Sequence, residues 1–352
     1  MSLLAIALIG WFLRDANLAD VWRHVRAARL DLLLLGFTFM ASTMWIRAVR
    51  WRHLLTPIGP TRFRTVFRAG VIGFAALAIL PARVGDLLRP YLVSRQENLP
   101  YSACLATIVM ERVLDLITVL TLMAVYVWGF ANTASWNPQL LGPIQLSAAG
   151  GAVVSVVLMG LMWVLASHPE RIGTFVHAAA WLLPRAMAKR LGDFASSFST
   201  GFAVARSPKE LVLSVIWSFP LWLAIAAESW AITRAFGIAI SFTGTFLLQA
   251  MLVVGVAVPT PGGVGSFHEA YRIGVTTFFG AANDAAVAAA IVLHFISFIP
   301  ILFLGMLFMV QDGLSLRSLT ALAGSAKAEQ KGDDKTGMAD DGTTMLRSPG
   351  HR

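Results

Sequence analysis

Two apolar runs in this chain stop at proline and glycine before they are long enough to cross a membrane. Residues 67–80 lead into the sequence PARVGD, and residues 242–258 lead into PTPGGVGS. Proline removes a backbone donor and glycine allows a sharp bend, so a helix ends at each point. A helix broken within the bilayer leaves polar backbone that must line a cavity or be buried in protein. Two such breaks in one chain are typical of the binding sites of membrane transporters.

Composition places the chain in a membrane. Hydrophobic residues make up 57% of the sequence and charged residues only 13%, too few to solvate a globular surface. The net charge of +9 comes from Lys and Arg that lie between apolar runs, which indicates anionic lipid head groups as partners and not nucleic acid. The single Cys104 lies inside an apolar run. It provides no disulfide framework and no thiolate metal site, so we expect neither a metal nor a cofactor.

Six further apolar runs are expected to cross the bilayer, which requires roughly 20 residues. They are residues 1–13, 30–45, 101–130, 144–166, 211–233 and 285–310. The first is the shortest, and we expect it to be a retained helix because no small-residue cleavage site follows it. The sequence therefore predicts an all-α, polytopic integral membrane protein. It would have about six full transmembrane helices and two re-entrant broken helical hairpins.

Loop charges predict the topology. The run 30–45 is expected to end at Arg47, and residues 47–68 carry arginines and no acid, so we expect this segment in the cytoplasm. Residues 131–143 have no charge and are expected outside, whereas the largely basic residues 168–210 return to the cytoplasm. These assignments agree only if the first broken run enters from the cytoplasm and the second from outside. The two runs then form an inverted repeat.

The remaining segments are expected to be peripheral. Residues 1–312 form one transmembrane domain, within which residues 167–209 have apolar stretches separated by basic residues. We expect this segment to lie on the membrane as an amphipathic helix, with binding of a partner as the alternative. Residues 313–352 lack apolar periodicity and are expected to be a disordered cytoplasmic tail.

The first turn carries charges where water is scarce. Arg83 and Arg89 are candidates to grip an anionic head group, because guanidinium binds phosphate bidentately, and Asp86 would orient one of them. Gly85 would allow the backbone to bend. The alternative is that these side chains lie at the membrane interface and reach for water or lipid.

Three more charged residues lie in the next apolar run. Arg112 is expected to pair with Asp115 or Asp86, because an unpaired arginine is costly in hydrocarbon. Glu111 has no obvious partner and is a candidate proton carrier. At a similar depth in the second half lies His294, which is more often a hydrogen-bonded helix residue than a functional one.

The second turn is the most specific string in the chain. Pro261, Gly262, Gly263 and Gly265 would expose backbone amides, and the following helix has an N-terminus that favours an anion. Glu269 lies in the first turn of that helix and is, with Glu111, a candidate proton carrier if transport is ion-coupled. It either offsets the helix dipole or pairs with a cationic group such as Arg272 or Arg112. Neither a Walker sequence nor a strand-borne GxGxxG is present.

Four sequence blocks, taken in their order along the chain, resemble the transmembrane region of lysylphosphatidylglycerol synthases. They are Arg-x-x-Arg-Trp at residues 47–51, Pro-x-Arg-x-Gly-Asp-x-x-Arg at 81–89, Glu-Arg-Val-x-Asp at 111–115, and Pro-x-Pro-Gly-Gly-x-Gly-x-x-x-Glu at 259–269. The resemblance extends over residues 3–312. It implies a flippase-like protein of a bacterial or archaeal inner membrane. It also implies site residues Arg83, Gly85, Asp86, Arg89, Glu111, Arg112, Pro261, Gly262, Gly263 and Glu269.

Two departures limit what the resemblance implies. Asp86 stands where many relatives carry glutamate, and no aminoacyl-transfer domain follows residue 310. Synthase activity is therefore not expected, and no catalytic motif is found. We expect a lipid translocase of the bacterial inner membrane with a cytoplasmic C-terminus, moving an anionic or polyprenyl-phosphate-linked lipid. The alternatives are a membrane enzyme that acts on a lipid carrier and a scaffold for a lipid-modifying enzyme.

Overall fold

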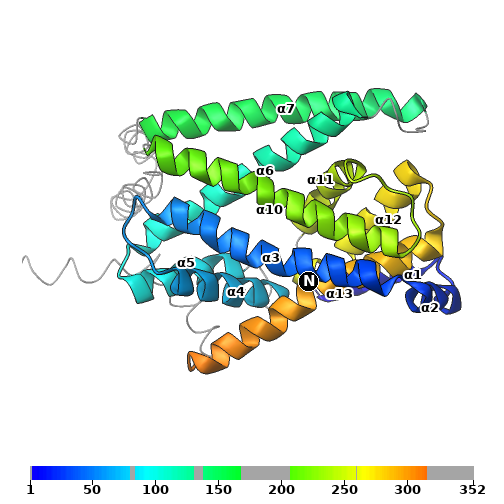
Figure 1. The fold of residues 1–352 in the computed structure, drawn as a ribbon, viewed down its shortest axis with the longest axis horizontal. Helices are drawn as coiled ribbons and strands as arrows, with labels where there is room; N and C mark the ends of the chain where they lie inside the picture. The colour runs from blue at the N-terminus through cyan, green and yellow to red at the C-terminus, as the bar shows by residue number, and fades with distance from the viewer. Residues whose placement is uncertain (1, 80–83, 131–137, 168–206, 259, 315–352) are drawn as a thin grey trace, which may run out of the picture.

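The protein is described by a computed structural model that covers residues 2–79, 84–130, 138–167, 207–258 and 260–314. Every regular element in these ranges is a helix (Figure 1), which confirms the predicted all-α fold. Arg83, most of the predicted amphipathic segment and nearly all of the predicted tail lie outside the described residues.

Five helices have 26 to 30 residues, a length sufficient to cross a bilayer. They are α3 (Leu30–Leu55), α6 (Tyr101–Gly129), α7 (Pro138–Ser167), α10 (Pro208–Ala235) and α13 (Asn283–Gln311). Within the described ranges, α3, α10 and α13 are long and apolar enough to span a membrane on composition alone. The chain is therefore a polytopic membrane protein.

Two pairs of short helices correspond to the predicted broken runs. The first pair is α4 (Phe63–Ile79) and α5 (Val84–Glu97); the second is α11 (Gly244–Ala257) and α12 (Ser266–Phe279), with the short 3₁₀ helix η3 (Pro261–Gly263) between them. At about 1.5 Å per residue the four helices are about 21 to 26 Å long. None reaches the roughly 30 Å of the hydrocarbon core. Each pair packs together as a hairpin.

The two hairpins enter the bundle from opposite ends. Helices α3 and α10 lie side by side (Figure 1) and antiparallel, because Arg50 contacts Ser218 whereas Gly36 lies against Ile232. The first hairpin begins after the end of α3, and the second begins after the end of α10. We call these the Leu55 end and the Ala235 end of the bundle.

The packing of the two halves follows an internal symmetry. Helices α3 to α6 form one half and α10 to α13 the other. In both halves a long helix is followed by a hairpin and a second long helix. Each hairpin also packs against the last long helix of the opposite half, α4 against α13 and α11 against α6. This reciprocal packing is what the predicted inverted repeat requires.

The end of α4, at the tip of the first hairpin, meets the turn of the second hairpin. Gly262 has a positive φ of 60°, and a β-carbon at this position would lie 3.4 Å from the carbonyl oxygen of Ala78. Gly265, with φ 88°, approaches the backbone of α1 just as closely. The positive φ favours glycine at both positions because other residues rarely adopt it, and at Gly265 a β-carbon would also overlap that of Leu8. The turn of the second hairpin is thereby seated on the end of α4.

Helix α3 is longer than the sequence predicted. The prediction that the helix ends near Arg47 is wrong, because α3 continues to Leu55 and Arg50 lies fully buried inside it. The reason is tertiary: Arg50 meets carboxylates of α6, which compensate its charge in the protein interior. Loop charge is a guide to topology only where the arginines remain at the surface.

The first helix differs from the other predicted crossings. Helix α1 (Ser2–Leu13) has 12 residues and is about 18 Å long. It packs against α12, and the next helix, α2 (Leu18–Ala27), packs against α13. Helix α1 therefore lies against the second hairpin, and α2 lies against the last long helix of the second half.

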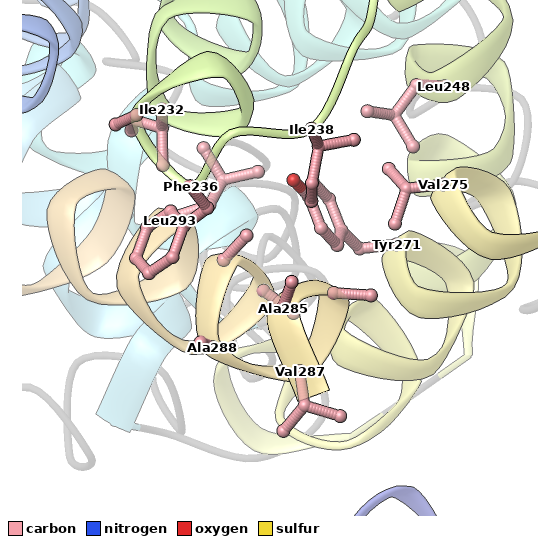
Figure 2. Packing of buried hydrophobic residues seen from close by; sticks show 14 of the residues in the cluster. Ile232, Phe236, Ile238, Leu248, Tyr271, Val275, Ala285, Val287, Ala288 and Leu293 are labelled. Carbon is pink, nitrogen blue, oxygen red and sulfur yellow. The ribbon is translucent and has the colours of Figure 1, made fainter. Parts of the chain in front are cut away.

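Small residues permit close packing in the second half. Residues 285–290 of α13 are buried, and five of these six are alanine. Figure 2 shows this stretch facing Ile232, Phe236 and the ring of Tyr271. Between helices in a membrane, small side chains allow the backbones to approach and increase van der Waals contact. The hydroxyl groups of Tyr271 and Thr233 lie 2.7 Å apart, which satisfies the buried phenol.

Candidate functional site

A buried group of six charged side chains lies beside the first hairpin. It consists of three arginines and three carboxylates from α3, α5 and α6, which we call the charged cluster: Arg50, Asp86, Arg89, Glu111, Arg112 and Asp115. The equal numbers compensate one another, as charged groups within a membrane require. Five of the six were predicted as site residues, together with Arg83; Arg50 was not.

Glu111 is the centre of the charged cluster. Its carboxylate is fully buried and accepts two hydrogen bonds from Arg89, at 3.0 and 3.3 Å. Arg50 and Arg112 lie 3.4 and 3.7 Å from the same group. The prediction that Glu111 has no partner is therefore wrong, because two arginines come from helices that the sequence could not place beside α6. This geometry makes Glu111 a counter-ion for three guanidinium groups.

Arg112 links the hairpin to α6. It contacts Asp115 at 3.4 Å and Asp86 at 3.5 Å, which confirms both predicted pairings. Asp86 was expected to orient Arg83 or Arg89, and the ion pair described for it is with Arg112. The side chain of Arg112 is 39% exposed, whereas that of Arg50 is 0% exposed. The charged cluster therefore has an inner, closed side and an outer side that remains accessible.

Neighbouring side chains hold the charged cluster in place. Asp115 accepts hydrogen bonds from Arg50 at 2.6 Å and from the indole of Trp222 at 3.0 Å. The guanidinium of Arg89 lies 4.5 Å from the ring centre of Trp51, a cation–π distance. Trp51 in turn donates a hydrogen bond to Thr107 at 2.9 Å. These contacts tie α3, α5, α6 and α10 together at one level of the bundle.

The charged residues of the second hairpin lie elsewhere. Glu269 pairs with Arg272 on the same helix at 2.5 Å, and Arg272 also donates to Asn283 at 3.1 Å. One predicted alternative, pairing with Arg272, is thus confirmed, and the pairing with Arg112 is wrong. Glu269 and Arg272 are one helical turn apart and satisfy each other locally. The second hairpin contributes glycines, not charges, to the meeting point of the tips.

The second turn is shaped by its glycines. Gly262, Gly263 and Gly265 have φ between 60° and 88°, and the amide of Gly265 donates to Nδ1 of His268 at 3.3 Å. The hydroxyl of Ser266 donates to the carbonyl of Gly263. The predicted sharp turn before α12 is therefore present. Gly262 and Gly263 line a cavity, and Gly265 packs on α1.

A cavity of about 430 Å³ lies between the two halves. Its walls come from both hairpins and from α3, α6, α10 and α13, and most of the wall is apolar. The polar side chains on the wall include Arg47, Arg112, Asp115, Glu228, Gln249 and Ser297. The volume lies within the range of small-molecule sites, roughly 300 to 1,000 Å³. One side of the charged cluster, Arg112 and Asp115, is thus part of a cavity wall.

Arg47, Glu228 and Gln249 were missed as site residues by sequence reasoning. Arg47 was assigned to a cytoplasmic loop, whereas it lies within α3 on the cavity wall. Glu228 is buried in α10 and accepts a hydrogen bond from Ser297 at 2.5 Å. A signal existed for Glu228, since a carboxylate inside an otherwise apolar run is costly and requires a reason.

His294 has a second histidine beside it. The rings of His294 and His268 lie 4.6 Å apart, and Phe298 stacks on His294 at 4.3 Å. These contacts are aromatic packing within the second half. The prediction of a hydrogen-bonded helix residue is wrong for Nδ1 of His294, which is buried and has no hydrogen-bond partner among the described residues.

Comparison with known proteins gives the family. Two archaeal proteins are each 24% identical to this chain. The glycosyltransferase AglD of Haloferax volcanii matches 84% of the chain, which spans about half (50%) of that protein. The UPF0104 membrane protein PH1989 of Pyrococcus horikoshii matches 86% of the chain over 93% of its own length.

The family model described as "Lysylphosphatidylglycerol synthase TM region" matches residues 1–305. This range includes both hairpins, the charged cluster and the cavity between the halves. The resemblance predicted from four short blocks is therefore confirmed, and the chain belongs to the family of lysylphosphatidylglycerol synthase transmembrane regions.

Proposed function

We propose that this protein moves a lipid with an anionic head group, or a polyprenyl-phosphate-linked lipid, between the leaflets of a bacterial inner membrane. The observation that carries the proposal is the central cavity, which is walled by hairpins from opposite ends of the bundle. Broken helices that meet around one site provide alternating access when either hairpin moves. The mostly apolar wall suits acyl or prenyl chains, and the polar side chains suit a head group.

The proposed orientation follows from charge. Exposed arginines lie at both ends of the bundle. The segments that join the Leu55 end carry more basic residues, because Arg52, Arg62, Arg64 and Arg95 lie there and the largely basic residues 168–206 directly precede α10 in the sequence. Under the positive-inside rule this end faces the cytoplasm, and so does the C-terminus that follows α13. Both predicted proton carriers, Glu111 and Glu269, are engaged by arginines. The proposal therefore does not route a proton through either of them.

Locking the two tips together tests the proposal. Ala78→Cys and Gly262→Cys in the same chain place thiols at the contact between the hairpins, and the chain's own Cys104 is buried away from it. We expect the oxidised double variant in liposomes to exchange a fluorescent anionic lipid no faster than protein-free vesicles, with recovery after reduction. The single variants are the controls. Unchanged exchange in fully cross-linked protein would contradict transport through this cavity.

A second function is favoured by one comparison. The relative AglD bears the name glycosyltransferase, so an enzyme that acts on a lipid carrier, or a membrane partner of such an enzyme, is the alternative. The same vesicles distinguish the two, because an enzyme would release a chemically altered lipid. Altered lipid without leaflet exchange would favour the alternative.

A further inference from the structure

Arg47 differs from the arginines of the charged cluster. Those three arginines share three carboxylates, whereas Arg47 has no ion pair or hydrogen bond to any residue of the described ranges. Its Nε is buried, and its guanidinium lies 5.1 Å from the ring centre of Phe74. A guanidinium at this depth is stabilised by an anion in direct contact, and none of the described side chains supplies that contact.

The side chain of Arg47 lies on the wall of the central cavity. Glu228 lies on the same wall but is not within ion-pair distance of Arg47, and its carboxylate is held by Ser297. Within the part of the chain that the structure describes, no carboxylate lies within ion-pair distance of Arg47, and Asp115, Glu111 and Glu228 act on it only from longer range. The space beside it is cavity, where a ligand can supply the missing charge.

Two more unsatisfied polar atoms border the same cavity. Nε of Arg112 is a buried donor without a partner, and Oε1 of Gln249 is a buried acceptor without one. The amide of Gln249 is oriented by its other end, since Nε2 donates to the carbonyl of Trp222 at 3.0 Å. Buried polar atoms are nearly always hydrogen-bonded in folded proteins, so unmet atoms around one cavity indicate a polar ligand.

We propose that Arg47 is the anion-binding residue of this cavity and takes the phosphate of a lipid. The proposal rests on the proposed function and identifies the group of the lipid that is recognised. Two guanidinium groups, of Arg47 and Arg112, present donors to phosphate oxygens, a pairing that arginine makes in planar, bidentate geometry. Gln249 accepts from a hydroxyl group, either on a phosphomonoester or on the head group itself. The apolar part of the cavity wall contacts the first part of the lipid's hydrocarbon chain.

Binding to purified protein in a neutral detergent provides the test. The probes are farnesyl phosphate, which has both phosphate and an apolar chain, and inorganic phosphate, which has phosphate alone. We expect Arg47→Gln to bind farnesyl phosphate at least about tenfold more weakly than the unchanged protein, since a charged hydrogen-bonding partner is lost. Arg47→Lys should be intermediate, because it keeps the charge and loses the bidentate geometry.

The matched control is Arg64→Gln, which removes the same charge from an exposed position at the Leu55 end, outside the cavity. It should bind like the unchanged protein. A thermal unfolding measurement separates binding from folding: Arg47 has no ion pair or hydrogen bond to a described residue to lose, so Arg47→Gln should unfold at about the same temperature as the unchanged protein.

Three results would overturn the proposal. They are equal affinity of Arg47→Gln and the unchanged protein for farnesyl phosphate, absence of binding by the unchanged protein, and binding of inorganic phosphate as tight as that of farnesyl phosphate. The last would assign the site to a free anion. Leaflet exchange is a separate measurement. Phosphate binding that depends on Arg47 in a protein that exchanges no lipid would support this site and contradict the proposed transport.

Discussion

Replacing Glu111 with glutamine is expected to destabilise the folded protein by about 3 to 5 kcal/mol. The carboxylate balances Arg89, Arg50 and Arg112 within 3.7 Å. Its loss leaves three guanidinium groups with two carboxylates, and two of the three, those of Arg50 and Arg89, are buried away from water. The change is measured as the free energy of unfolding in mixed detergent micelles, followed by circular dichroism.

The matched control for Glu111 is Asp31→Asn. Asp31 pairs with Arg29 at 2.6 Å, and both side chains are exposed, at 63% and 65%. An ion pair that water can replace contributes about 1 kcal/mol or less. Equal effects of the two substitutions would show that the charged cluster is not a buried, mutually dependent network.

A methyl group at Gly85 is expected to separate the helices of the first hairpin, at a cost of about 3 kcal/mol in unfolding free energy. A β-carbon there would overlap the carbonyl oxygen of Gly73 and lie 2.7 Å from the backbone nitrogen of Leu77. Both obstacles are backbone atoms, so a change of side-chain rotamer cannot make room. The free energy of unfolding is measured in the same micelles as for Glu111→Gln.

Gly70→Ala is the control for this crowding. Gly70 lies in α4 of the same hairpin, and a β-carbon at this position would meet no atom within 4 Å. Alanine in a helix is favoured over glycine by roughly 0.5 to 1 kcal/mol, so Gly70→Ala should be neutral or stabilising. A loss of stability at Gly70 as large as at Gly85 would refute the argument from close packing.

The hairpins could be predicted from the sequence because their cause is local. Proline and glycine end α4 and α11 through backbone chemistry alone, and the lengths of the apolar runs exclude a crossing. The pairing of Arg112 with Asp115 could also be predicted from the sequence, because residues three apart share a helix face. The family resemblance also rested on short local blocks, and the match over residues 1–305 confirms it.

The partners of Arg50 and Glu111 could not be predicted from the sequence. Arg50 is separated by 65 residues from Asp115, and Glu111 by 22 residues from Arg89. Nothing within either helix indicates which face meets the other. Arg47 was misplaced for a related reason, because an arginine near the end of an apolar run has the same local pattern whether it faces a cytoplasmic loop or a buried cavity.

The reciprocal packing of the hairpins has a consequence for synthesis. The first hairpin leaves the ribosome early, but the helix that covers it, α13, is the last one of the described chain. Gly305 of α13 fits against Ala75 and the backbone of Val71 with no room for a side chain, so no lipid tail fills that contact as closely. Until α13 has been synthesised, one face of the nascent α4 lacks its packing partner. A chaperone or insertase that shields this face would act after the synthesis of α4 and before that of α13.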